Sequence, residues 1–212
     1  MRPLSDEDNR RIEEAVKKAE AKTSGEIVVT VADASGNYGS ATLQGALIGM
    51  AIVTAVFLML PLPHTMTTLL WTEFISFAVF YTILPYLPWR RRLISKRKLD
   101  ARVREAALMQ FYSSGIYRTR QSNGVEIYLS QFEREVVVIG DRGIHEKMGD
   151  QHWHQVRDLI INGIKEGNLC GGICAAVESC GEALAKHFPH RPDDVNELPD
   201  IVIPRPIKPE AL

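Results

Sequence analysis

The residues whose types suggest metal chemistry are the histidines and cysteines of the C-terminal half. His152 and His154 are two positions apart, and on a helix such residues point to different faces, so they cannot chelate one ion together. Cys170 and Cys174 are four apart and share a helix face, but no second pair completes the four ligands of a zinc site. We therefore interpret these cysteines, with Cys180, as small side chains of a buried helix.

Phosphoryl transfer is the second chemistry that the sequence raises. It needs a nucleophile or a metal-bound water, together with cations that neutralise the phosphoryl charge. The sequence contains no Cys-x5-Arg loop, and the one suggestive cation is Arg142, next to Asp141. A surface salt bridge is the ordinary role of such a pair, so we assign no catalytic residue.

Composition narrows the class of protein. The 212 residues carry a formal net charge of -1, which gives no overall field for nucleic acid. The first residues lack an apolar core and a cleavage site, so we expect no signal peptide. An odd number of cysteines then argues against a disulfide framework.

Two apolar segments predict a transmembrane helical hairpin, which we place at residues 40–89. Residues 41–62 carry no charge, and about 20 helical residues span a hydrocarbon core of roughly 30 Å. A second apolar segment covers residues 68–89 and contains the single acid Glu73. Gly45 and Gly49 form a small-xxx-small pair, which lets two helices approach closely. The lipid bilayer is therefore the first expected partner.

Sidedness follows from the basic residues after the second segment. Six Lys or Arg residues lie between positions 90 and 98, and the turn between the segments has only His64. Positive-inside logic places residues 90 onward in the cytoplasm. Because a hairpin returns the chain to the side it left, residues 1–39 are expected there too, most simply at a bacterial inner membrane.

Outside the hairpin the patterns predict an α/β domain in two parts, residues 1–39 and 90–188. Helices are expected at 5–23, 96–120, 150–166 and 169–187, and strands at 26–32, 125–130 and 135–140. The simplest assembly places all three strands in one small sheet with helices on its faces. Residues 189–212 hold six prolines and are expected to form an extended tail.

The order of these motifs resembles the TPM domain family. The resemblance rests on Leu4 to Asp8, Lys22 to Val29, Asn123 to Leu129, Gly143-Ile144 and Glu166 to Asn168 with the glycines that follow. It implies a three-layer α/β/α domain around a small sheet, here interrupted by the transmembrane hairpin. Some family members are described as thylakoid-lumen acid phosphatases or photosystem II repair factors, others bind calcium, and many have no established activity.

The resemblance also implies where acidic loops lie. The family has two acids before the arginine of the strand–strand turn, and only Glu133 remains here. The family's glycine-rich loop after the second strand of the pair contains Asp141 here, and the family's later aspartate falls at Asp150. Asp33 is a further candidate. Calcium prefers six to eight oxygen ligands, so these carboxylates with backbone carbonyls and water are the candidate metal set. Calcium is the one cofactor that the sequence leaves open.

The depleted acidic set favours a non-catalytic module that binds, assembles or maintains other membrane proteins. Its expected partners are the bilayer and a second membrane protein, with no nucleic acid. The alternative is a metal-dependent enzyme similar to an acid phosphatase. A channel or transporter is a weaker alternative, because two spans with one acid make a poor pathway.

Overall fold

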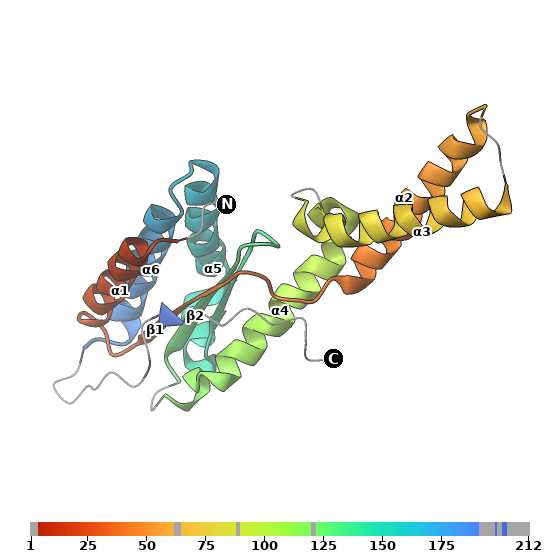
Figure 1. Cartoon of the computed structure of the whole chain (residues 1–212). Helices are drawn as coiled ribbons and strands as arrows, with labels where there is room; N and C mark the ends of the chain where they lie inside the picture. Colours follow the sequence, from red (N-terminus) through yellow and green to blue (C-terminus); the bar gives the residue numbers. More distant parts are fainter. Residues whose placement is uncertain are drawn as a thin grey trace. The chain divides into compact units, whose positions relative to one another are not determined.

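A computed structural model describes residues 4–61, 65–87, 90–119, 122–190, 198 and 201–202, without the side chains of 145, 146, 148–151, 201 and 202. The chain divides into two compact units, Met1–Gly36 with Asp100–Leu212, and Asn37–Leu99. Figure 1 shows the elements of both.

A mixed sheet is the centre of the first unit. Its strands are β1 (Glu26–Ala32), β2 (Gly124–Ser130), β3 (Glu135–Gly140) and the two-residue β4 (Ile201–Val202), in the order β3-β2-β1-β4. Strand β1 pairs in parallel with β2, although more than ninety residues separate them, and β2 pairs antiparallel with β3. The predicted assembly of three strands in one sheet is confirmed. Strand β4, which lies in the predicted tail, was not expected.

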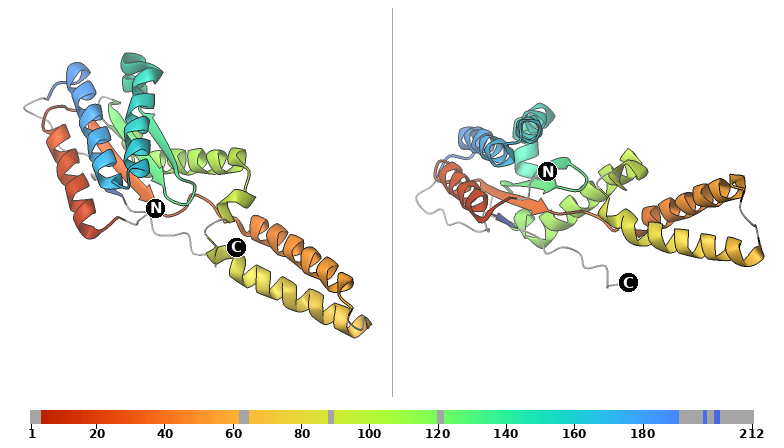
Figure 2. Two further views of the ribbon diagram at one scale, coloured as in Figure 1. Left: turned by 90° about the horizontal axis from the view of Figure 1, so that it is seen from above. Right: turned by 45° about the horizontal axis from the view of Figure 1, so that its top comes forward.

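One face of the sheet is covered by α1 (Asp6–Glu20), α5 (Arg142–Lys165) and α6 (Leu169–His187). Figure 2 shows these three helices together on that face. The sheet contributes alternate aliphatic side chains to this core, namely Ile27, Val29, Val31, Val125, Ile127 and Leu129. Helix α1 begins at a capping box, in which the Ser5 hydroxyl accepts the Asp8 N–H and Asp8 Oδ2 accepts the Ser5 N–H.

Small residues bring α6 close to its neighbours. A Cβ on Gly172 would lie 3.0 Å from Gly163 Cα in α5, and one on Gly181 would lie 2.6 Å from Ala19 Cβ in α1. These contacts let two helix pairs pack with their backbones nearly touching. The two glycines therefore set the spacing of the helical layer.

The opposite face of the sheet is covered by residues 100–113 of α4 (Lys96–Ser113) and by the 3-10 helix η3 (Ile116–Arg118). Val103 and Ala107 pack near Ala32 and Tyr128, and Phe111 packs with Val28 and Ile116. The predicted helix 96–120 is therefore too long, because Gly115 adopts a positive φ of 74° and the chain turns. With helices on both faces, the predicted mixed α/β class is confirmed.

The second unit is a pair of apolar helices, α2 (Gly39–Met59) and α3 (Met66–Ile83), followed by the 3-10 helices η1 (Leu84–Tyr86) and η2 (Arg90–Leu93). A Cβ on Gly49 would lie 2.6 Å from the Phe80 ring, so the predicted close approach at this glycine is confirmed. Residues 39–59 and 66–86 are each 21 residues long, with mean hydropathies of 2.0 and 1.4. By length and composition both can span a membrane.

Candidate functional site

Glu133 lies in the turn between β2 and β3, and its carboxylate points inward. It is 1% exposed. One carboxylate oxygen accepts the backbone N–H of Ser35 at 2.9 Å, and the other accepts the hydroxyl of Ser130. The side chain therefore ties the segment after β1 to the end of β2, and both of its oxygens are used in structural hydrogen bonds.

Asp141 lies at the other end of β3, where it is the N-cap of α5. Its Oδ1 accepts the N–H of Arg142 at 2.6 Å, and its backbone N–H donates to the Gly124 carbonyl at 2.9 Å. The sequence pattern predicted that this helix begins near Asp150, and that boundary is wrong. Helix α5 begins at Arg142, so Asp150 lies within the described helix backbone, and its side chain is outside the described residues.

The structure does not bring Glu133 and Asp141 together. The six residues of β3 lie between them, and a strand of that length spans roughly 20 Å. Calcium ligands lie about 2.3–2.6 Å from the ion, so these two carboxylates cannot bind the same one. Asp33 does lie at the Glu133 end, where its carbonyl accepts the N–H of Phe132. Among the residues whose side chains are described, no three His, Cys, Asp or Glu groups are placed to hold a metal.

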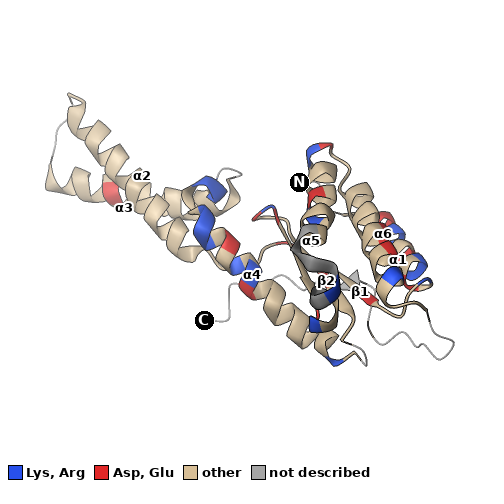
Figure 3. Cartoon of the chain, turned by 180° about the vertical axis from the view of Figure 1, so that it is seen from behind, with Lys and Arg blue, Asp and Glu red and all other residues tan. Residues whose placement is uncertain are grey.

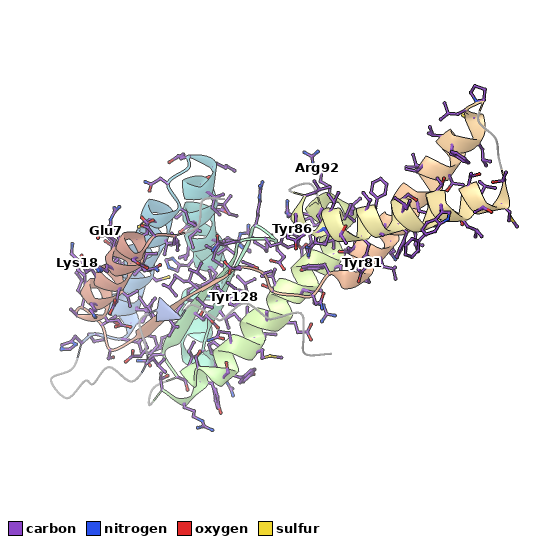
Figure 4. All side chains as sticks on the ribbon, in the orientation of Figure 1. Glu7, Lys18, Tyr81, Tyr86, Arg92 and Tyr128 are labelled. Carbon is purple, nitrogen blue, oxygen red and sulfur yellow. The ribbon has the colours of Figure 1, made fainter. Side chains whose placement is uncertain are left out.

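A buried polar cluster lies on the α4 side of the sheet, and the sequence patterns did not predict it. Besides Glu133 it contains Ser35, whose hydroxyl lies 3.1 Å from the Tyr128 hydroxyl and donates to Ser130 Oγ at 2.7 Å. All of these side chains are buried. Figure 4 marks Tyr128 on the sheet that carries them. Burial raises the pKa of Tyr128, and the nearby charges of Glu133 and Glu126 raise it further, whereas the hydrogen bond between Tyr128 and Ser35 lowers it.

Glu126 is the most unusual member of this cluster, because it lies in the middle of β2 with no exposed surface. Its Oε1 accepts the Thr30 hydroxyl at 2.8 Å, whereas its buried Oε2 has no hydrogen-bond partner among the described residues. Burial raises the pKa of Glu126 from 4.5 to about 7, and the Thr30 bond offsets only part of this shift. The carboxyl group therefore changes its charge near neutral pH inside the domain.

Polar and apolar residues alternate from Val125 to Ser130, and this pattern places the polar residues of the cluster on one side of the strand. Polar residues at every second position usually mark a solvent-facing side of a strand. Here all seven residues of β2 are buried, because α4 covers the side that carries Glu126, Tyr128 and Ser130. The helical periodicity of residues 96–113 was the sequence feature that could have predicted this coverage, because a helix of that length can cover one side of the strand.

A groove of about 300 Å³ lies elsewhere, between α1 and α6. Lys18 and Lys22 line one part of it and Glu178 and Glu182 another, with Cys174 also on its wall. Figure 3 shows both signs of charge on these two helices. The mixed lining does not favour a strongly charged ligand of either sign.

The cysteines lie on α6 as expected, all as free thiols. Cys170 and Cys180 are buried, and burial raises the pKa of both thiols to about 12. A thiol that stays protonated at neutral pH is a poor nucleophile. This agrees with their interpretation as core side chains.

Comparison with known proteins gives a family for part of the chain. Residues 93–183 match the TPM domain. No curated protein matches the chain. Among solved structures, the NMR structure of the BA42 protein from the psychrophilic bacterium Bizionia argentinensis matches with a TM-score of 0.60 and 24% identity, over 96% of this chain and 97% of that one. This likeness is one of fold. The family match therefore shows a TPM domain for residues 93–183 alone.

Proposed function

We propose that this protein is anchored in a membrane by α2 and α3, and that its TPM domain is a non-catalytic module that binds or maintains another membrane protein. The observation that carries the anchoring is the apolar surface of the two helices. In the most apolar 18-residue stretch of residues 39–59, only 17% is buried within the structure, and in that of residues 66–86 only 11% is buried. A core helix of a soluble protein would instead be mostly covered.

The exposed side chains explain why water is an unfavourable solvent for this unit. They include Met59, Leu70, Phe74 and Ile75, all more than half exposed. Apolar surface costs roughly 25 cal/mol for each Å² left in water, and both helices carry such surface on all sides. Transfer into lipid removes this cost, whereas the backbone groups of both helices are already paired internally.

The proposed sidedness rests on the cations at the open end of the hairpin. Arg90, Arg91 and Arg92 follow the second span directly, and Lys96, Arg97 and Lys98 come next. Figure 3 shows that α2 and α3 themselves carry almost no charge. By the positive-inside rule the open end and both parts of the TPM domain face the cytoplasm, at a bacterial inner membrane.

A binding role is supported by the way the domain uses its acids. Glu133 and Asp141 serve as structural hydrogen-bond acceptors, at opposite ends of β3. A metal-dependent phosphatase needs carboxylates that converge on an ion with open coordination positions. The contacts of these two residues instead stabilise the fold of the domain.

Carbonate extraction and thiol labelling test the anchoring and the sidedness. In a chain without its native cysteines, Pro61→Cys marks the exposed turn after α2, and Lys18→Cys marks the exposed face of α1. The full chain is expected to stay in the membrane pellet at high pH. An impermeant maleimide should label the Pro61→Cys variant in intact spheroplasts, and the Lys18→Cys variant only after lysis.

Release of the chain by carbonate would refute the anchoring, and labelling at position 18 in intact cells would refute the sidedness. For the binding role, cross-linking of the full chain in native membranes should recover a membrane protein. The same purified chain should leave phosphomonoesters intact at acid and neutral pH, with or without Ca²⁺. Metal-dependent turnover would favour the phosphatase-like alternative.

A further inference from the structure

The second unit has an uneven distribution of charge. Residues 37–99 contain six basic residues and one acid, whereas the rest of the chain has a net charge of -6. The acid, Glu73, lies ten residues before the end of α3, which corresponds to about 15 Å along a helix. The unit therefore carries five more positive than negative charges, and the first acid after the basic segment is Asp100.

The fold of the unit holds the basic segment against the first turns of α2. Close approach at Gly45 brings Leu84 of η1 and Leu93 of η2 against that helix, with a Cβ at this position overlapping Leu84. The Lys98 ammonium donates to the hydroxyl of Ser40 at 3.0 Å, which joins the first turns of α4 and α2. The cations are therefore kept at the open end of the hairpin.

Exposed apolar and aromatic side chains accompany these cations. Tyr86 is 87% exposed and Leu93 is 41% exposed, and both belong to the short helices that follow α3. Figure 4 shows Tyr86 and Arg92 extending from this segment. Tyrosines and long basic side chains combine in this way at the headgroup level of a bilayer.

We infer that the basic segment Arg90–Lys98 binds the phosphate headgroups of anionic phospholipids. This inference rests on the proposed anchoring, because only insertion of α2 and α3 brings the segment to headgroup depth. The cations are spread over nine residues, and Arg92, Lys96 and Arg97 among them are exposed, which fits a layer of headgroups better than a single soluble anion. Each basic residue near an anionic surface contributes roughly 1 kcal/mol.

The test measures binding of fluorescent phosphatidylglycerol to the full chain in an uncharged detergent, with phosphatidylcholine as the reference lipid. The test variant carries Arg92→Gln, Lys96→Gln and Arg97→Gln, three exposed positions of the segment. A matched variant carries Arg10→Gln, Lys18→Gln and Lys22→Gln, which removes three exposed cations from α1 and the residues after it. We expect phosphatidylglycerol to bind roughly 100-fold more weakly to the test variant and equally well to the matched one.

Added salt should weaken the wild-type binding, because the charges are exposed. Equal affinity for both lipids, or an equal loss in the matched variant, would overturn the inference. Full displacement of the lipid by an equal concentration of inorganic phosphate would also overturn it and indicate a free-anion site. Failure of anchoring is seen separately, as release of the wild-type chain by carbonate, whereas the lipid measurement in detergent does not depend on that result.

Discussion

At the residue scale, Glu126 combines complete burial with a charge that depends on pH. No titratable residue of α4 faces it, since the buried positions of that helix beyond residue 100 are Val103, Ala107 and Phe111. Its titratable neighbour on the strand is Tyr128, which supplies no positive charge. Ionisation of Glu126 is therefore costly, which is why its pKa is raised.

Glu126→Gln is expected to change the pH dependence of stability. A raised pKa in the folded state means that the folded protein binds the proton more tightly. The wild-type protein should therefore lose stability as pH rises from about 4.5 through about 7. The amide cannot ionise, so the free energy of unfolding of the variant should rise by about 3 kcal/mol relative to that of the wild type across this range.

The measurement is denaturant unfolding of the full chain in detergent, followed by tryptophan fluorescence between about pH 4.5 and about pH 8.5, a range that brackets the raised pKa. Glu178→Gln serves as a control, because this carboxylate is exposed on α6. The stability of this control should depend on pH in the same way as that of the wild type. Parallel curves for Glu126→Gln and wild type would show that Glu126 keeps one charge state throughout.

At the element scale, the packing of α5 on α6 depends on backbone contact. Gly163 and Gly172 face each other, so the two helices approach more closely than side chains of ordinary size would allow. A Cβ at position 172 would also meet the Leu159 carbonyl at 3.1 Å, and backbone atoms cannot move aside as a flexible side chain would.

Gly172→Ala is accordingly expected to destabilise the domain by about 1–3 kcal/mol, although alanine favours the helix itself. Thermal unfolding of the full chain measures the effect. Ala175→Ser, on the exposed side of the same helix, adds one atom without such contact and should change stability by about 0.5 kcal/mol. An unchanged or higher melting temperature for Gly172→Ala would mean that α5 and α6 can separate at little cost.

At the scale of the whole molecule, the chain leaves the sheet unit after β1 and returns to it in α4. Ala32 and Val103 nevertheless pack in one cluster, and among the described side chains the two main clusters of the sheet unit include none from 37–99. The apolar hairpin is therefore an insertion that the sheet unit does not need for its own core.

Replacement of residues 37–99 by about six glycine and serine residues should leave a soluble, folded domain. The reason is that β1 pairs directly with β2 and the linker spans only the gap between Gly36 and Asp100. Solubility after sedimentation and dispersed amide resonances measure the outcome, with the full chain in the membrane pellet as the control. Aggregation of the shortened chain would mean that the hairpin is part of the folding unit.

Much of this protein follows from local patterns in the sequence. The capping box at Ser5, the apolar runs of α2 and α3, and the β-branched strands each depend on residues within one element, so spacing alone predicts them. The separation of Glu133 and Asp141 was also within reach, because the predicted strand between them is itself about 20 Å long.

Only the tertiary structure decided how these elements cover one another. The coverage of β2 by α4 turned a polar strand face into a buried one, so Glu126 entered a low-dielectric environment. Pairing of the tail with β1, and the extension of α5 back to Asp141, depend on contacts with residues far away in the chain. Burial and long-range pairing are properties of the packed chain, and for that reason no single segment encodes them.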